Sequence, residues 1–214
     1  TFDTRLRDEI RAGRRIGPRV LAANEAISVP GGHMAGSVAI AARTVDEALA
    51  QVDAVHAQGA DLVKLMITGG VMDATERGMP GEVKMPAEMV RAVCERAHAL
   101  GIPVVLGNDT SCQWVAQYDF WRELCYFHEY AGASNACALY CATGQSARMA
   151  GLGDVTGTLR PGLCADMLVT SENPLADLRA LRTLDMVVAR GRIIDRPRPK
   201  RSARLDAGLD TLLA

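Results

Sequence analysis

The sequence has few aromatic residues and no long apolar run. Phe, Trp and Tyr make up only 4% of its 214 residues. No stretch reaches the roughly 18 consecutive apolar residues of a membrane-spanning helix, and no secretory signal peptide is recognisable. The low aromatic content, with abundant Ala, Leu, Val and Gly, favours helices packed on strands of small residues over a β-sandwich. We therefore expect no membrane partner.

The sequence also lacks a dominant charge. Lys and Arg number 24 and Asp and Glu number 25, which gives a formal net charge of -1. A nearly neutral chain offers no electrostatic reason to bind nucleic acid or an anionic membrane. With 49% hydrophobic and 23% charged residues, the composition is that of a globular protein with one sizeable core or two modest ones.

None of the six cysteines forms a C-x-x-C pair. In a chain of this length that pattern indicates reduced thiols and predicts a cytoplasmic protein. Cys137 and Cys141 are four residues apart on an expected helix. They fit two interpretations, a metal-binding pair or two small buried side chains.

Several catalytic motifs are absent. The sequence contains no H-x-H and no H-E-x-x-H, so no local motif identifies a zinc site. It also contains no P-loop and no nucleophile elbow. None of these local motifs therefore identifies a catalytic centre.

The first half of the chain alternates short apolar strands with amphipathic helices. We expect strands at 18–23, around Lys64 and at 102–106, and helices at 45–58 and 86–100. A possible capping box opens the first of these helices and a glycine ends each of them. Such alternation is typical of βα units that build a parallel sheet.

The second half has a different pattern. Helices are expected at 115–130 and 134–149, followed by strands at 165–170 and 185–189 without a long helix between them. These strands indicate a small antiparallel module. We therefore predict three parts: an α/β part at 1–150, a small β module at 151–195 and a surface tail at 196–214.

Three residues are candidates for chemistry because each lies in or just after an expected strand, where α/β barrels place their active sites. Lys64 sits in an apolar strand, where burial is costly without a partner or a role; alternatively it reaches the rim and pairs with a carboxylate. Asp109 follows the strand at 102–106, but it could also cap the next helix. His33 lies in a glycine-rich loop and could be simply solvated.

Several stretches together resemble the metal-dependent amidohydrolase superfamily, in particular its imidazolonepropionase-related and Xaa-Pro dipeptidase-like branch. The resemblance rests on Gly31-Gly32-His33, on the run from Gly59 to Gly70 and on Gly107-Asn108-Asp109. Two later runs are specific in combination, namely Gly157-Thr158-Leu159-Arg160-Pro161-Gly162-Leu163-Cys164-Ala165-Asp166 and Val188-Ala189-Arg190-Gly191.

This resemblance implies an α/β fold, a (β/α)8 TIM-type barrel joined to a small β-sandwich, with only part of the barrel present here. It implies a hydrolase that cleaves carbon–nitrogen bonds of small or dipeptide-like substrates with one or two divalent metals, commonly zinc. Lys64 would carry a carbamate formed from CO2 and would bridge the metals. Asp109 would bind metal and act as general base on the metal-bound water. His33 would lie near the substrate.

The sequence departs from the family pattern in its histidines. The first-strand His-x-His and the two histidines of the middle strands have no counterpart, and Asn108 stands where Thr is usual. The chain is therefore either an incomplete version of a longer enzyme or an inactive remnant with a structural or assembly role. A partial barrel would expose sheet edges, so we also expect a homo-oligomer.

Overall fold

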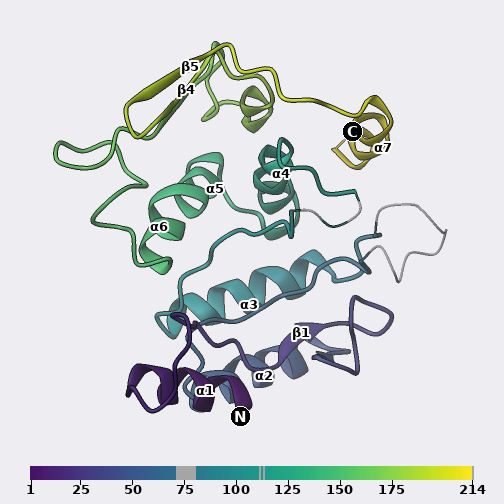
Figure 1. Ribbon diagram of the computed structural model, residues 1–214. Helices are drawn as coiled ribbons and strands as arrows, with labels where there is room; N and C mark the ends of the chain where they lie inside the picture. Colours follow the sequence, from purple (N-terminus) through teal and green to yellow (C-terminus); the bar gives the residue numbers. More distant parts are fainter. Residues whose placement is uncertain (71–80, 111, 113, 214) are drawn as a thin grey trace. The chain divides into compact units, whose positions relative to one another are not determined.

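The computed structural model describes residues 1–70, 81–110, 112 and 114–213. The chain forms two compact units, Thr1–Pro103 and Val104–Ala214, whose elements are labelled in Figure 1. The predicted boundaries after residues 150 and 195 stay predictions. No helix in the described part of the chain has the length and apolarity that a membrane crossing requires.

Three helices form most of the first unit: α1 Phe2–Arg11, α2 Val45–Ala57 and α3 Ala87–Ala99. The two longer helices begin and end where the sequence predicts. Thr44 Oγ1 accepts a hydrogen bond from Glu47 N at 3.2 Å and so caps α2. Gly59 and Gly101 follow α2 and α3 with positive φ angles of 77° and 76°, which glycine adopts without a steric penalty.

The strands of the first unit are short and parallel. Strand β1 (Ala26–Ser28) pairs with β2 (Ala39–Ala41), with Ile27 opposite Ile40. On its other side, β1 forms a parallel bridge from Ile27 to Leu65. Ile27 N donates to Lys64 O at 2.9 Å, and Met66 N donates to Ile27 O at 3.0 Å. The Lys64 segment is therefore the third member of a small parallel arrangement.

Helices α2 and α3 pack together, and buried residues of both helices and of β1 belong to the core of the first unit. The inward positions predicted for α2, namely Ala48, Val52 and Val55, are all buried. The same holds for Met89, Val93 and Ala97 on α3. Ile27 on β1 is fully buried at 0% exposure. Apolar residues at helical spacing thus decide which face of each helix is covered.

The second unit opens with helices α4 (Phe120–Ala131) and α5 (Asn135–Tyr140), continued by a π-helical turn, η1 (Cys141–Gln145), and by α6 (Ser146–Met149). Ser134 Oγ caps α5 by accepting from Cys137 N at 3.2 Å. The core of these helices is a cluster of Trp121, Leu124, Cys125, Ala138 and Leu178. The last of these lies on a 3-10 helix, η2 (Leu178–Arg182).

A three-stranded antiparallel sheet follows, and two of its strands lie within the predicted segments 165–170 and 185–189. Its strands are β3 (Met167–Val169), β4 (Met186–Ala189) and β5 (Arg192–Asp195), in the order β3-β4-β5. Arg190 and Gly191 turn the chain between the last two strands with φ angles of 49° and 79°, as a tight hairpin turn requires. All four residues of β5 are exposed.

Two sequence-based expectations were wrong. The chain is not in a strand at 18–23 or at 102–106, since neither segment joins a ladder of described strands. Strand β1 starts later, at Ala26, where partners exist on both sides. The segment expected as a surface tail, 196–214, contains α7 (Ala203–Asp210) and η3 (Thr211–Leu213), and two aspartates of α7 pair with a buried arginine of α4. Local composition does not reveal such distant partners.

The fold is mixed α/β, as predicted. Its described strands form one parallel pair and one antiparallel sheet of three. The finer expectations of a (β/α)8 TIM-type barrel and a β-sandwich stay predictions.

Candidate functional site

His33 lies just beyond the end of β1, in the glycine-rich loop. Its backbone N donates to Thr68 O at 3.1 Å, which ties the loop to the end of the Lys64 segment. The imidazole fills the space beside Gly70, so that a Cβ at this glycine would overlap the ring. Two loops that follow parallel strands thus meet at His33. They lie at the carboxyl ends of these strands, which is the edge of the sheet where α/β proteins place their ligands.

The chain beyond the Lys64 segment folds back on itself. Thr68 forms an antiparallel bridge with Val83, and Gly69 N donates to Glu82 O at 2.8 Å. A Cβ at Gly81 would lie 2.6 Å from the backbone N of Gly70. Only glycine allows the two backbones to approach so closely. The ends of the long loop are therefore fixed beside His33, while its residues 71–80 lie outside the described ones.

Ser28, the last residue of β1, is a polar side chain that the sequence reading missed. It is buried at 0% exposure, and its Oγ has no hydrogen-bond partner among the described residues. Gly32 passes so close that a Cβ there would lie 2.5 Å from this oxygen. A Ser at the end of an otherwise apolar strand was the available signal, since polar groups are rarely buried without a reason.

Lys64 differs from the expectation of a buried cation. Its backbone pairs with Ile27, but its side chain is exposed. Leu65 and Val63 beside it are only partly covered. The first unit alone therefore imposes no desolvation cost on the ammonium group. Whether Lys64 binds metal stays a prediction.

Asp109 lies in the second unit and is exposed, with a positive φ of 54°. Its carboxylate accepts from Cys112 Sγ at 3.1 Å, and its carbonyl oxygen accepts from Cys112 N at 3.1 Å. The hydrogen bond and the negative charge of Asp109 raise the pKa of the Cys112 thiol. The capping interpretation was wrong, because α4 has Asp119 at its N-cap position.

The three predicted site residues are therefore divided. His33 and Lys64 belong to the first unit, where His33 N donates to Thr68 O in the segment that follows Lys64. Asp109 belongs to the second unit. Among the described residues, no three His, Cys, Asp or Glu side chains lie close enough to hold one metal ion. Catalytic zinc needs three protein ligands. The described residues therefore do not by themselves fit a complete metal centre.

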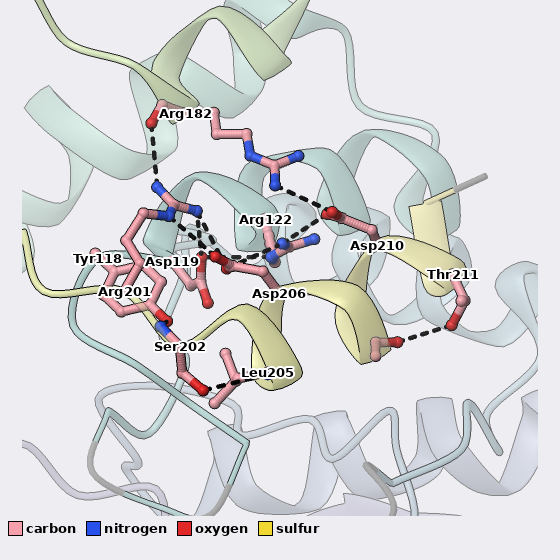
Figure 2. A network of polar contacts seen from close by, with 11 residues as sticks. Tyr118, Asp119, Arg122, Arg182, Arg201, Ser202, Leu205, Asp206, Asp210 and Thr211 are labelled. Carbon is pink, nitrogen blue, oxygen red and sulfur yellow. Dashed lines mark hydrogen bonds and ion pairs between the residues drawn. The ribbon is translucent and has the colours of Figure 1, made fainter.

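The second unit contains a buried charge network that the sequence reading also missed (Figure 2). The Arg122 side chain on α4 is only 3% exposed, and its Nη2 lies 2.7 Å from Asp210 Oδ1. Asp206 and Asp119 lie farther away, at 3.7 Å and 3.4 Å from its nitrogens. Asp206 and Asp210 are four apart and so share one helical face, which was the signal in the sequence.

The network shifts the pKa values of two of its aspartates in opposite directions. Burial raises the pKa of Asp119, against the lowering effect of the Arg122 charge. Burial also acts on Asp210, but the hydrogen bonds from Arg122 and Arg182 outweigh it and lower its pKa. The Arg122 guanidinium also stacks over Trp121, 4.5 Å from the ring centre. The network attaches the C-terminal helix to α4, so we assign it a structural role.

No protein-family model matches the sequence, and no curated protein matches it either. Solved structures do match. The chain is similar to a protein from Bifidobacterium longum that has been assigned as a prolidase, with 29% sequence identity and a TM-score of 0.54. The match covers 99% of this chain and 74% of that one. This similarity confirms the predicted resemblance to the metal-dependent amidohydrolase superfamily.

Two other solved structures are similar at lower levels. One is described as an amidohydrolase, with 18% identity, a TM-score of 0.49 and coverage of 91% of this chain and 73% of that one. The other is a Xaa-Pro dipeptidase with methionine bound in its active site, with 19% identity, a TM-score of 0.42 and coverage of 90% and 72%. At these TM-scores neither structure adds weight to a functional assignment.

Proposed function

We propose that this relative of the metal-dependent amidohydrolases is a hydrolase of carbon–nitrogen bonds, and that its substrates are dipeptide-like molecules with a C-terminal proline. The observation that carries this proposal is the similarity to the Bifidobacterium longum protein along 99% of the chain. No observation favours the alternative of an inactive remnant.

We assign His33 to substrate binding. It stands at the end of β1, its loop is tied to Thr68, and its ring rests on Gly70. A partly exposed imidazole held in this way can donate a hydrogen bond to a substrate carboxylate or carbonyl oxygen. Its fixed position would orient the substrate relative to the strand ends.

We assign Lys64 and Asp109 to the hydrolytic centre on the family resemblance. Lys64, as a carbamate, and Asp109 would supply oxygen ligands to divalent metal, which in this family activates the attacking water. Two such residues fall short of the three protein ligands that catalytic zinc needs. A complete centre would therefore need ligands from outside the described residues.

The proposal is tested by a substrate panel. The purified full chain is supplied with Zn²⁺ and bicarbonate and is offered three substrate classes: Xaa-Pro dipeptides, N-acyl amino acids and simple carboxyl esters. Release of free amino acid or alcohol is measured for each class. We expect turnover of Xaa-Pro dipeptides with the highest kcat/KM of the three.

The matched variants are His33→Ala and His98→Ala, because His98 lies on α3, outside the proposed site. We expect His33→Ala to raise KM with a smaller change in kcat, since it removes binding shared by substrate and transition state, and His98→Ala to leave both unchanged. Hydrolysis of esters alone, or of none of the three classes, would overturn the proposal.

A further inference from the structure

Two of the six cysteines bring their sulfur atoms together at the junction of α5 and the π-helical turn. The Sγ atoms of Cys137 and Cys141 lie 4.0 Å apart, because residues four apart share one face of a helix. Cys141 is 3% exposed, whereas Cys137 is partly exposed. The pair is therefore reachable from solvent at one sulfur and supported by the core at the other.

The separation of the two sulfur atoms suits a bridging metal ion better than a disulfide bond. A disulfide needs Cβ atoms about 3.5–4.5 Å apart, whereas Cβ atoms at helical i and i+4 positions are about 5–6 Å apart. Zinc bonds to thiolate sulfur at about 2.3 Å, so two such bonds to sulfurs at this separation enclose about 120° at the metal. An ion thus fits between the sulfurs with little distortion of the helix.

The backbone around this pair is also unusual. The π-helical turn begins at Cys141, and such turns occur frequently at functional sites. Ser146 Oγ donates to Cys141 O at 2.6 Å, which holds the carbonyl group that the wider turn displaces. The backbone at the inner cysteine is therefore held before any ligand binds, and less ordering is needed on binding.

We propose that Cys137 and Cys141 form a binding site for a thiophilic divalent metal ion. Zn²⁺ is the ion that the site would bind, and Cd²⁺ is the probe used to detect it. Both thiols lose a proton on binding, because the thiolate is the metal ligand. No third His, Cys, Asp or Glu of the described chain joins them. Water completes the coordination sphere, and the affinity is lower than that of four-ligand structural zinc sites.

The other cysteines provide controls. Cys94 and Cys164 are half-buried like Cys137, but each lies far from it in the sequence. Cys125 lies in the core of the second unit, where burial raises the pKa of its thiol to about 11. It therefore contributes no thiolate near neutral pH.

The site is tested by titrating the reduced full chain with Cd²⁺ without oxygen and recording the ultraviolet thiolate-to-metal charge-transfer band. Sites made of oxygen and nitrogen ligands give no such band, and Cys112→Ser removes the thiol that donates to Asp109, so the result is independent of the proposed hydrolytic centre. We expect a band that saturates at one ion per chain. We expect at least tenfold weaker binding in Cys137→Ser and in Cys141→Ser, and no change in Cys94→Ser or Cys164→Ser.

Cys137→Ser is the most informative variant, because its partly exposed side chain can be changed without opening the core. An unchanged helical circular dichroism spectrum would show that this variant keeps its fold. An unchanged band and affinity in Cys137→Ser would overturn the site. Absence of the band from the reduced wild-type chain would do the same.

Discussion

At the scale of single residues, the contact between His33 and Gly70 is what the structure adds most clearly to the sequence. The sequence marks both residues as parts of loops after strands. The backbone bond from His33 N to Thr68 O then places the ring on the glycine. A side chain at position 70 would compete with His33 for the same space.

Gly70→Ala should therefore disturb His33 directly. The φ of 68° at Gly70 alone costs an alanine about 1–2 kcal/mol, and the overlap with the imidazole adds to that cost. We expect a larger loss of unfolding free energy than in the matched control Gly101→Ala, which has a φ of 76° and nothing within 4 Å of its added Cβ. We also expect the His33 ring signals in NMR spectra to shift only in Gly70→Ala. Equal losses in both variants with unmoved His33 signals would contradict the contact.

The lowered pKa of Asp61 predicts how the stability of the first unit depends on pH. Burial tends to raise its pKa, but the hydrogen bonds from Ala22 N, Arg7 and Arg11 outweigh this and lower it. A lowered folded-state pKa stabilises the fold above the unfolded value of about 3.9, and this stabilisation is lost as the pH falls through the folded value.

The free energy of unfolding of wild type and Asp61→Asn, measured in urea from pH 7 to pH 2, checks this sign. We expect wild type to be more stable at pH 7 and the difference to shrink below about pH 4. The control Asp195→Asn removes a carboxylate that is 60% exposed and paired with the exposed Arg196, so its effect should be small throughout. A difference for Asp61→Asn that grows toward low pH would contradict the assignment.

At the scale of elements, the helices were more predictable than the strands. Helices α2 and α3 carry their own start and stop signals, namely Thr44 and the glycines after each helix, so local sequence suffices. Strands depend on partners elsewhere in the chain. The apolar run at 18–23 was therefore expected as a strand, although β1 forms later, at Ala26. In the same way, the pairing of α7 with Arg122 is set by residues far apart in sequence.

The attachment of α7 predicts a large effect of removing Arg122. Arg122→Met keeps most of the volume but removes the positive charge nearest to the buried Asp119, at 3.4 Å, and leaves it only the longer contact with Arg201 at 3.7 Å. Breaking a buried ion pair in this way typically costs about 3–5 kcal/mol. The loss is measured by urea unfolding followed by the fluorescence of Trp121, over which the guanidinium stacks.

Two further variants make this result specific. Arg122→Met combined with Asp119→Asn should recover part of the lost stability, because no uncompensated charge then remains at position 119. Arg196→Ala removes an exposed pair with Asp195 and should change the stability by about 1 kcal/mol or less. If Arg122→Met behaves like Arg196→Ala, the buried network does not hold α7.

At the scale of the whole molecule, the exposed strands predict self-association. All four residues of β5 are exposed, and Ile193 and Ile194 are 62% and 45% exposed. An exposed apolar edge strand tends to pair with another chain. We therefore expect an oligomer by light scattering at micromolar concentration, and a shift toward monomer when Ile193 is changed to Lys. A wild-type monomer would contradict this expectation.

The functional reading depends on the whole chain as well. The sequence alone marked Lys64, Asp109 and His33, and the similarity to the Bifidobacterium longum protein supports the family that links them. What could not be predicted is how the three residues lie relative to one another, because that depends on packing between distant segments. Lys64 is exposed in its own unit, and its catalytic role stays a prediction.

The most direct test is therefore the kcat/KM for release of proline from Xaa-Pro dipeptides by wild type, Lys64→Ala and Lys200→Ala. Lys200 is an exposed lysine in the last segment of the chain and serves as the matched control. We predict measurable turnover by wild type, a loss of about 100-fold or more in Lys64→Ala and no change in Lys200→Ala. Absence of turnover by wild type, or equal turnover by wild type and Lys64→Ala, would contradict the account.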